Sequence, residues 1–120
     1  MSQRAGVDEG RAETLTRATL ETLAERVSGG EADDLAAQLP KSLQEYLRPR
    51  DGGEPFGLED FKQRVAERAG LGASEVVDDI RAILTTVREA VSGGEFSDMI
   101  EQLPDEFWEL IEPTSWRGDR

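Results

Sequence analysis

Residues 28–40 read SGGEADDLAAQLP, and residues 92–104 read SGGEFSDMIEQLP. Both stretches begin with Ser-Gly-Gly-Glu and end with Gln-Leu-Pro, and both have an aspartate at the seventh position. Shifting the chain by 64 residues aligns more than these stretches, because roughly half of the positions from 17 to 47 are identical to their shifted counterparts. Such self-similarity at a fixed offset is typical of a duplicated supersecondary unit. The sequence therefore predicts one structural unit used twice.

The stretch before each Ser-Gly-Gly-Glu has the apolar spacing of an amphipathic helix. In the second copy the apolar positions are Val76, Ile80, Ile83, Leu84, Val87 and Val91. The matching positions in the first copy are Ala12, Thr16, Thr19, Leu20, Leu23 and Val27. We expect a long helix in each copy, and we expect three matched pairs to be buried: Leu20 with Leu84, Val27 with Val91, and Leu39 with Leu103.

Glycines and prolines mark where the predicted helices end and begin. Gly29-Gly30 and Gly93-Gly94 follow the long helices, where a left-handed glycine can close a helix and a second glycine permits a change of direction. These four residues are predicted to be structural corners.

The Gln-Leu-Pro triplets predict a second kind of corner. Pro40 and Pro104 fit the first turn of a further short helix, because the missing N–H of proline would be unpaired there in any case. Gln38 and Gln102, directly before each Leu-Pro, are expected to bond the open carbonyl groups of the preceding helix.

The two copies differ at their beginnings. Residues 56–67, FGLEDFKQRVAE, form an apolar stripe that predicts a leading helix for the second copy, whereas the first copy has only three residues in the equivalent place. The fold is therefore expected to be all-α, an internally duplicated helical bundle with two copies of a three- to four-helix unit, the first copy lacking its leading helix. The single domain of residues 1–120 divides into repeat one (4–47), a linker (48–55), repeat two (56–111) and a tail (112–120).

A missing leading helix would leave the long helix of the first copy partly uncovered. We expect an apolar groove there that takes a helix from a second copy of the chain or from a partner protein. The alternative is that the linker or the tail covers it. The candidate interaction surface comprises the groove residues and two tryptophans: Leu15, Thr16, Thr19, Leu20, Leu23, Trp108 and Trp116.

Pairs of carboxylates stand three residues apart at the start of the helix after each Gly-Gly. Glu31 with Asp34, and Glu95 with Asp98, could bind a divalent cation or act as general acid and base. They also complement the positive end of a helix dipole. Since the chain lacks EF-hand spacing and has no histidine for a Glu-x-x-His motif, we interpret them as solvated helix starts. No catalytic residue, metal site or cofactor is predicted.

Composition excludes several kinds of chemistry. The chain of 120 residues has a formal net charge of -12, no cysteine and no histidine. Strong negative charge argues against nucleic acid and anionic membranes as partners. The chain has no apolar stretch long enough to cross a bilayer, and its N-terminal residues lack the apolar stretch of a signal peptide, so we expect a cytoplasmic protein. The excess of arginine over lysine and of acidic residues fits either adaptation to a salty cytoplasm or a GC-rich genome.

Three motifs stand out along the chain: Arg-Ala-x-Leu leading into Ser-Gly-Gly-Glu, Asp-x-x-x-Gln-Leu-Pro, and FKQRVAERAGL at the opening of a repeat. In these motifs the sequence resembles the prokaryotic family called the domain of unknown function 2267. The resemblance implies an all-helical, internally duplicated fold. It implies no established activity and supplies no catalytic residues.

From these observations we expect a non-enzymatic, acidic protein-interaction or self-association module that binds a protein partner or forms a homodimer. One alternative is an acidic regulator that occupies a basic, nucleic-acid-binding surface of another protein. A second alternative is a carboxylate-based, metal-dependent enzyme.

Overall fold

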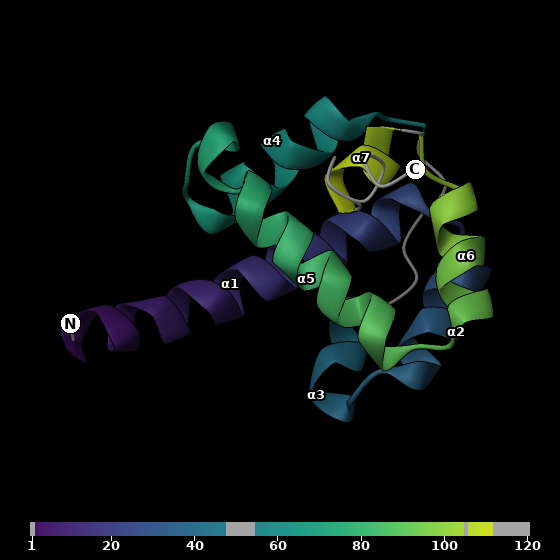
Figure 1. The fold of residues 1–120 in the computed structure, drawn as a ribbon, viewed down its shortest axis with the longest axis horizontal. Helices are drawn as coiled ribbons and strands as arrows, with labels where there is room; N and C mark the ends of the chain where they lie inside the picture. The colour runs from purple at the N-terminus through teal and green to yellow at the C-terminus, as the bar shows by residue number, and fades with distance from the viewer. Residues whose placement is uncertain (1, 48–54, 105, 112–120) are drawn as a thin grey trace, which may run out of the picture.

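The computed structural model describes residues 2–47, 55–104 and 106–111, and this part of the chain contains helices and loops but no strand, as the all-α prediction requires (Figure 1). The first half holds α1 (Ser2–Arg26), α2 (Gly29–Gln38), α3 (Lys41–Gln44) and the 3₁₀-helix η1 (Glu45–Leu47). The second half holds α4 (Leu58–Ala69), the 3₁₀-helix η2 (Ala73–Glu75), α5 (Val77–Ala90), α6 (Gly93–Glu101) and α7 (Glu106–Ile111). The expected tail 112–120, and the expected linker except Pro55, lie outside the described residues.

The helices surround one apolar core. In Figure 1, α5 crosses the front of the molecule, α4 and α7 lie above it, and α2 and α6 lie together at the right. The N-terminal end of α1 extends away from the other helices. None of the described helices combines the length and the apolar character needed to span a membrane.

The apolar face predicted for α5 is the face that the core buries. Its fully or nearly buried residues are Val76, Ile80, Leu84, Val87 and Val91, whereas Ile83 is half-buried. The three matched pairs expected in the core are all buried: Leu20 and Leu84, Val27 and Val91, Leu39 and Leu103. Helical spacing of apolar residues therefore identified these core positions in both halves, although Ala12 of the face predicted for α1 is exposed.

The position of α4 differs from the expectation. We expected the helix with Phe61 and Val65 to belong to the second copy alone, and to leave α1 partly uncovered. Instead α4 packs mainly against α1. Phe61 and Val65 are fully buried, and the ring of Phe61 meets that of Phe107 edge-on at 5.2 Å between centroids. The leading helix of the second half thus supplies the cover that the first half was expected to lack.

A polar seam fixes α4 to α1. Arg64 and Arg68 bind the two carboxylate oxygens of Glu25 at 3.0 and 2.6 Å, and Arg68 also donates to the hydroxyl of Thr22 at 2.8 Å. Burial alone would raise the pKa of Glu25, but the hydrogen bonds and charges of Arg68 and Arg64 outweigh it, so the pKa is lowered. The guanidinium of Arg64 lies over the ring of Phe56 at 3.9 Å from its centroid, which adds a cation–π contact beside the seam.

The Gly-Gly pairs are not left-handed corners, which corrects the prediction for Gly29, Gly30, Gly93 and Gly94. They are the first residues of α2 and α6, and none of them has a positive φ. The chain turns because the residue before each pair is extended: Ser28 has φ -65° and ψ 158°, and Ser92 has φ -67° and ψ 156°. Each serine then caps its helix by accepting the N–H of the glutamate three residues on, at 3.2 and 3.1 Å.

The prolines precede the helices they were expected to open, Pro40 by one residue and Pro104 by two. Pro40 is the N-cap of α3, and its carbonyl accepts the N–H of Leu43 at 2.9 Å. The carbonyl of Pro104 accepts the N–H of Phe107 in the same way at 3.0 Å. Both prolines therefore mark helix starts, as predicted.

The left-handed glycine of the described residues is Gly70, with φ 74°, at the end of α4. The N–H of Leu71 bonds the carbonyl of Ala66 at 2.9 Å, and the N–H of Gly70 bonds that of Glu67 at 3.3 Å, the pattern of a Schellman cap. The sequence-matched Arg4-Ala5-Gly6 lies inside α1 instead. The same tripeptide, Arg-Ala-Gly, therefore ends a helix in the second half and lies within a helix in the first half.

Gly70→Ala is expected to lower the free energy of unfolding by about 1 kcal/mol, because a side chain is strained at positive φ. Nothing lies within 4 Å of the added Cβ, so the cost is backbone strain alone. Gly94→Ala is the matched control, because Gly94 is helical and equally open; its free energy of unfolding should rise by up to about 1 kcal/mol. Urea unfolding measures both changes, and effects of the same sign would contradict this assignment.

Candidate functional site

Two glutamines connect α2 to α6. The side-chain oxygen Oε1 of Gln102 accepts the backbone N–H of Ser28 at 2.9 Å, and Oε1 of Gln38 accepts that of Ser92 at 2.6 Å. Each glutamine therefore binds the start of the opposite helix, not the carbonyl groups of its own helix as expected. The carbonyl of Leu39 is bonded instead by Nε2 of Gln44, at 3.1 Å.

This cross-connection changes what the glutamates can do. Ser-Gly-Gly-Glu has the spacing of a capping box, in which the glutamate side chain would return to the N–H of the capping serine. In both helices that N–H is already taken by the glutamine of the opposite helix. The carboxyl groups of Glu31 and Glu95 therefore do not bond the N–H groups of the capping serines.

These carboxyl groups meet between the helices. One oxygen atom from each of Glu31, Asp34 and Glu95 lies within 4.8 Å of the others. Glu31 is only 7% exposed, and the Oε2 atoms of Glu31 and Glu95 are buried without a hydrogen-bond partner. Solvation at a helix start, the interpretation drawn from the sequence, therefore fails for Glu31. Asp34 is exposed and opens one side of the cluster to water.

Burial, and then the neighbouring Glu95, Asp98 and Asp34, raise the pKa of Glu31 to about 8. All of these influences disfavour its ionised form. Near neutral pH, and in the absence of a bound cation, the Glu31 carboxyl group therefore keeps its proton.

Stability should consequently fall as pH rises, in a buffer free of divalent cations. Between pH 4.5, the ordinary pKa of a glutamate, and about 8, the folded protein keeps a proton on Glu31 that the unfolded chain has released. The stabilisation from this proton is complete at the acidic end and lost as pH passes about 8. Glu31→Gln stays neutral, so its free energy of unfolding should fall less over this range and exceed that of the wild type at the alkaline end.

Urea unfolding at a series of pH values measures this difference. Glu13→Gln makes the same chemical substitution at an exposed position of α1 and serves as the control, which should keep the slope of the wild type. Parallel pH profiles for Glu31→Gln and the wild type would show that Glu31 ionises normally.

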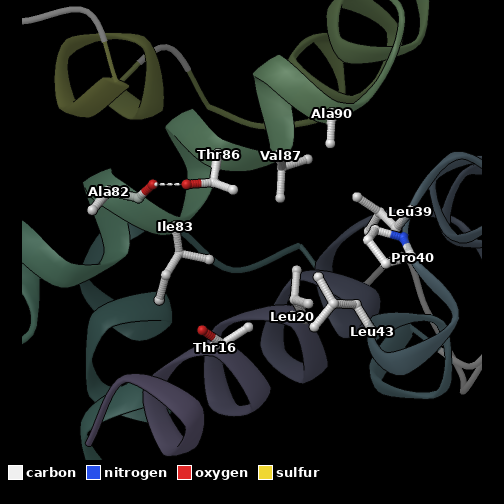
Figure 2. Close-up of a pocket in the computed structure, with 10 residues that line it drawn as sticks. All are labelled: Thr16, Leu20, Leu39, Pro40, Leu43, Ala82, Ile83, Thr86, Val87 and Ala90. Atoms are coloured by element: carbon white, nitrogen blue, oxygen red, sulfur yellow. Dashed lines mark hydrogen bonds between the residues drawn. The ribbon is translucent and has the colours of Figure 1, made fainter. Parts of the chain in front are cut away.

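A second feature is an apolar pocket of about 300 Å³ between α1, α5 and the chain around α3 (Figure 2). Its lining residues are Thr16, Leu20, Leu39, Pro40, Leu43, Ala82, Ile83, Thr86, Val87 and Ala90. No charged side chain is among them. The hydroxyl of Thr86 is bonded to the carbonyl of Ala82 in its own helix at 2.9 Å, so this wall of the pocket presents mainly carbon.

The pocket contains only part of the predicted interaction surface. Thr16 and Leu20 line it, and Leu20, which is fully buried, forms part of its inner wall. The remaining α1 residues, Leu15, Thr19 and Leu23, are buried in the core and do not form an exposed groove, which corrects the prediction; α4 covers that helix. The side chain of Trp108 and all of Trp116 lie outside the described residues.

Sequence reasoning missed the α5 side of the pocket. Ala82, Thr86 and Ala90 recur every four residues, so they form a stripe of small side chains along α5, and all three are exposed. The spacing of these small residues is visible in the sequence, but the prediction for this helix considered only its larger apolar residues. The pocket therefore lies where small residues of α5 face α1 and the Leu-Pro corner.

Comparison with known proteins agrees with the resemblance described above. The family model DUF2267, described as an uncharacterized conserved protein, matches residues 1–110. No curated protein and no solved structure shows significant similarity to the chain. The matched region includes both Ser-Gly-Gly-Glu segments and every described helix except the last residue of α7. The chain therefore belongs to the DUF2267 family.

Proposed function

We propose that this protein is a non-enzymatic interaction module that holds an apolar, positively charged segment of a partner protein in the pocket between α1, α3 and α5. The observation that carries the proposal is the pocket itself: ten lining residues from separate parts of the chain, none of them charged. Its volume of about 300 Å³ is at the lower end of the range for ligand sites, which suits a few apolar side chains.

The walls of the pocket are held by the core. Leu20 and Val87, which line it, belong to the buried faces of α1 and α5. Leu39 is also buried, and the hydrogen bond from Gln44 fixes its carbonyl. A pocket whose walls are already packed costs little ordering free energy on binding.

Charge selects the kind of partner. At a net charge of -12, two copies of this chain repel each other, whereas lysines and arginines flanking an apolar segment are attracted. We therefore favour a basic partner over a homodimer. This choice includes the acidic-regulator alternative, in which the bound segment belongs to a nucleic-acid-binding protein. The absence of histidine and cysteine from the chain supports a role in binding and not in catalysis.

We also propose that the two halves are copies of one unit. The reciprocal hydrogen bonds support this, because Ser28 and Ser92, and Gln38 and Gln102, are matched positions of the sequence repeat.

Two synthetic amphipathic helical peptides with one shared leucine face test the binding function. One peptide carries lysines beside the apolar face and the other carries glutamates. Fluorescence anisotropy should show that the lysine peptide binds and that its affinity falls as salt is added, while the glutamate peptide binds at least about tenfold more weakly.

Comparing Thr86→Lys with Gln63→Lys distinguishes binding in the pocket from general electrostatic attraction to the acidic protein. Both changes add one positive charge at an exposed helix position, but only Thr86 lines the pocket. Thr86→Lys should weaken binding of the lysine peptide at least about tenfold and Gln63→Lys less than about twofold. Equal effects would mean that charge alone attracts the peptide. Light scattering tests the alternative of self-association. If the wild type is a dimer and Thr86→Lys is a monomer, the pocket binds a second copy of this chain and not a partner protein.

A further inference from the structure

We propose that Glu31, Asp34 and Glu95 form a binding site for a hard divalent cation, of the class of Ca²⁺, which bridges α2 and α6. The proposal does not depend on the apolar pocket, and the two can fail separately.

The spacing of the three carboxyl groups suits such an ion. Their ligand oxygens lie within 4.8 Å of one another. Calcium–oxygen distances are about 2.3–2.6 Å, so two oxygens on opposite sides of one ion stand roughly 5 Å apart and neighbouring ones closer. Carboxylate oxygens are the ligands that hard cations prefer, and Ca²⁺ tolerates irregular geometry.

A second observation points to a ligand independently of this clustering. The Glu31 side chain is more than nine-tenths buried, with 7% of its surface exposed, and its Oε2 atom has no hydrogen-bond partner. The buried Oε2 of Glu95 is unpartnered as well. Buried polar atoms are nearly always paired, so these two atoms on facing helices require either a proton shared between the carboxyl groups or a cation that both can bind.

Helix capping does not explain these atoms. The N–H groups that Glu31 and Glu95 would bond in a capping box are held by Gln102 and Gln38. The two carboxyl groups are instead directed toward each other and toward Asp34. A cation between them would offset the repulsion among the carboxylates and connect the two halves of the chain.

The open side of the cluster provides the rest of the coordination. Asp34 is exposed, so water molecules can reach an ion held at this edge. Three protein carboxylates with several waters give the six to eight oxygen ligands that Ca²⁺ takes. Asp98, exposed on α6, adds negative charge close enough to influence Glu31.

Isothermal titration calorimetry with CaCl₂ on the full chain, near pH 8 and after treatment with a chelator, tests the site. We expect saturable binding of one ion per chain and a rise in Tm of about 5 to 10 °C when the free Ca²⁺ concentration is roughly 100 times Kd. NaCl at matched ionic strength should reproduce little of this rise. MgCl₂ serves as a second probe and should bind more weakly, since Mg²⁺ demands stricter geometry.

Neighbouring aspartates provide a matched pair of variants. Asp33 and Asp34 are both exposed on α2, but only Asp34 belongs to the cluster, so both variants are expected to fold. Asp34→Asn should raise Kd for Ca²⁺ at least about tenfold, whereas Asp33→Asn, with the same change of charge, should leave it within about twofold. Glu95→Gln should also raise Kd at least about tenfold.

Two results would overturn the proposal. One is the absence of saturable Ca²⁺ binding up to about 10 mM, beyond the weakest protein calcium sites; the buried carboxyl groups would then share a proton only. The other is an equal loss of affinity in Asp33→Asn and Asp34→Asn, which would show diffuse attraction to the acidic surface.

Discussion

Two reciprocal hydrogen bonds, from the N–H of Ser28 to Gln102 and from the N–H of Ser92 to Gln38, set the relation between the halves of this molecule. A serine N-cap with a glutamate three residues later would ordinarily be self-sufficient. Here each half gives its glutamine to the other, so neither α2 nor α6 completes its cap alone. The exchange lies where α2 and α6 pack side by side and where Glu31 and Glu95 approach each other.

The same corner also connects the acidic cluster to the pocket. α2 carries Glu31 in its first turn and ends at Gln38, and the next two residues, Leu39 and Pro40, line the pocket. Charge and apolar surface are thus placed at opposite ends of one short helix. In the function proposed above, the exposed carboxylates would attract basic partners at long range, and the pocket would supply the contact area that net charge cannot.

Much of this fold could be predicted from the sequence. Apolar spacing identified the buried face of α5 and the buried pairs Leu20–Leu84 and Val27–Val91, because a 3.6-residue period is a local property. The partner of α4 could not be predicted, since both α1 and α5 present apolar faces and only three-dimensional packing selects between them. The burial of Glu31 was missed for a related reason. Glu95, which lies beside it, and Gln102, which binds the N–H of Ser28, are both distant in sequence. The sequence pattern of a capping box is also the same whether or not the box forms within its own helix.

The ionisation of Glu31 is the most direct measure of the cross-connection. ¹³C NMR of the glutamate carboxyl carbons, recorded as a pH titration without divalent cations, reports each group separately. The structure predicts one carboxyl that titrates near 8, that is absent in Glu31→Gln, and that moves toward 4.5 in Gln102→Ala, where the N–H of Ser28 becomes free to recapture the Glu31 side chain. A wild-type spectrum in which every glutamate titrates close to 4.5 would contradict the buried carboxyl cluster between α2 and α6.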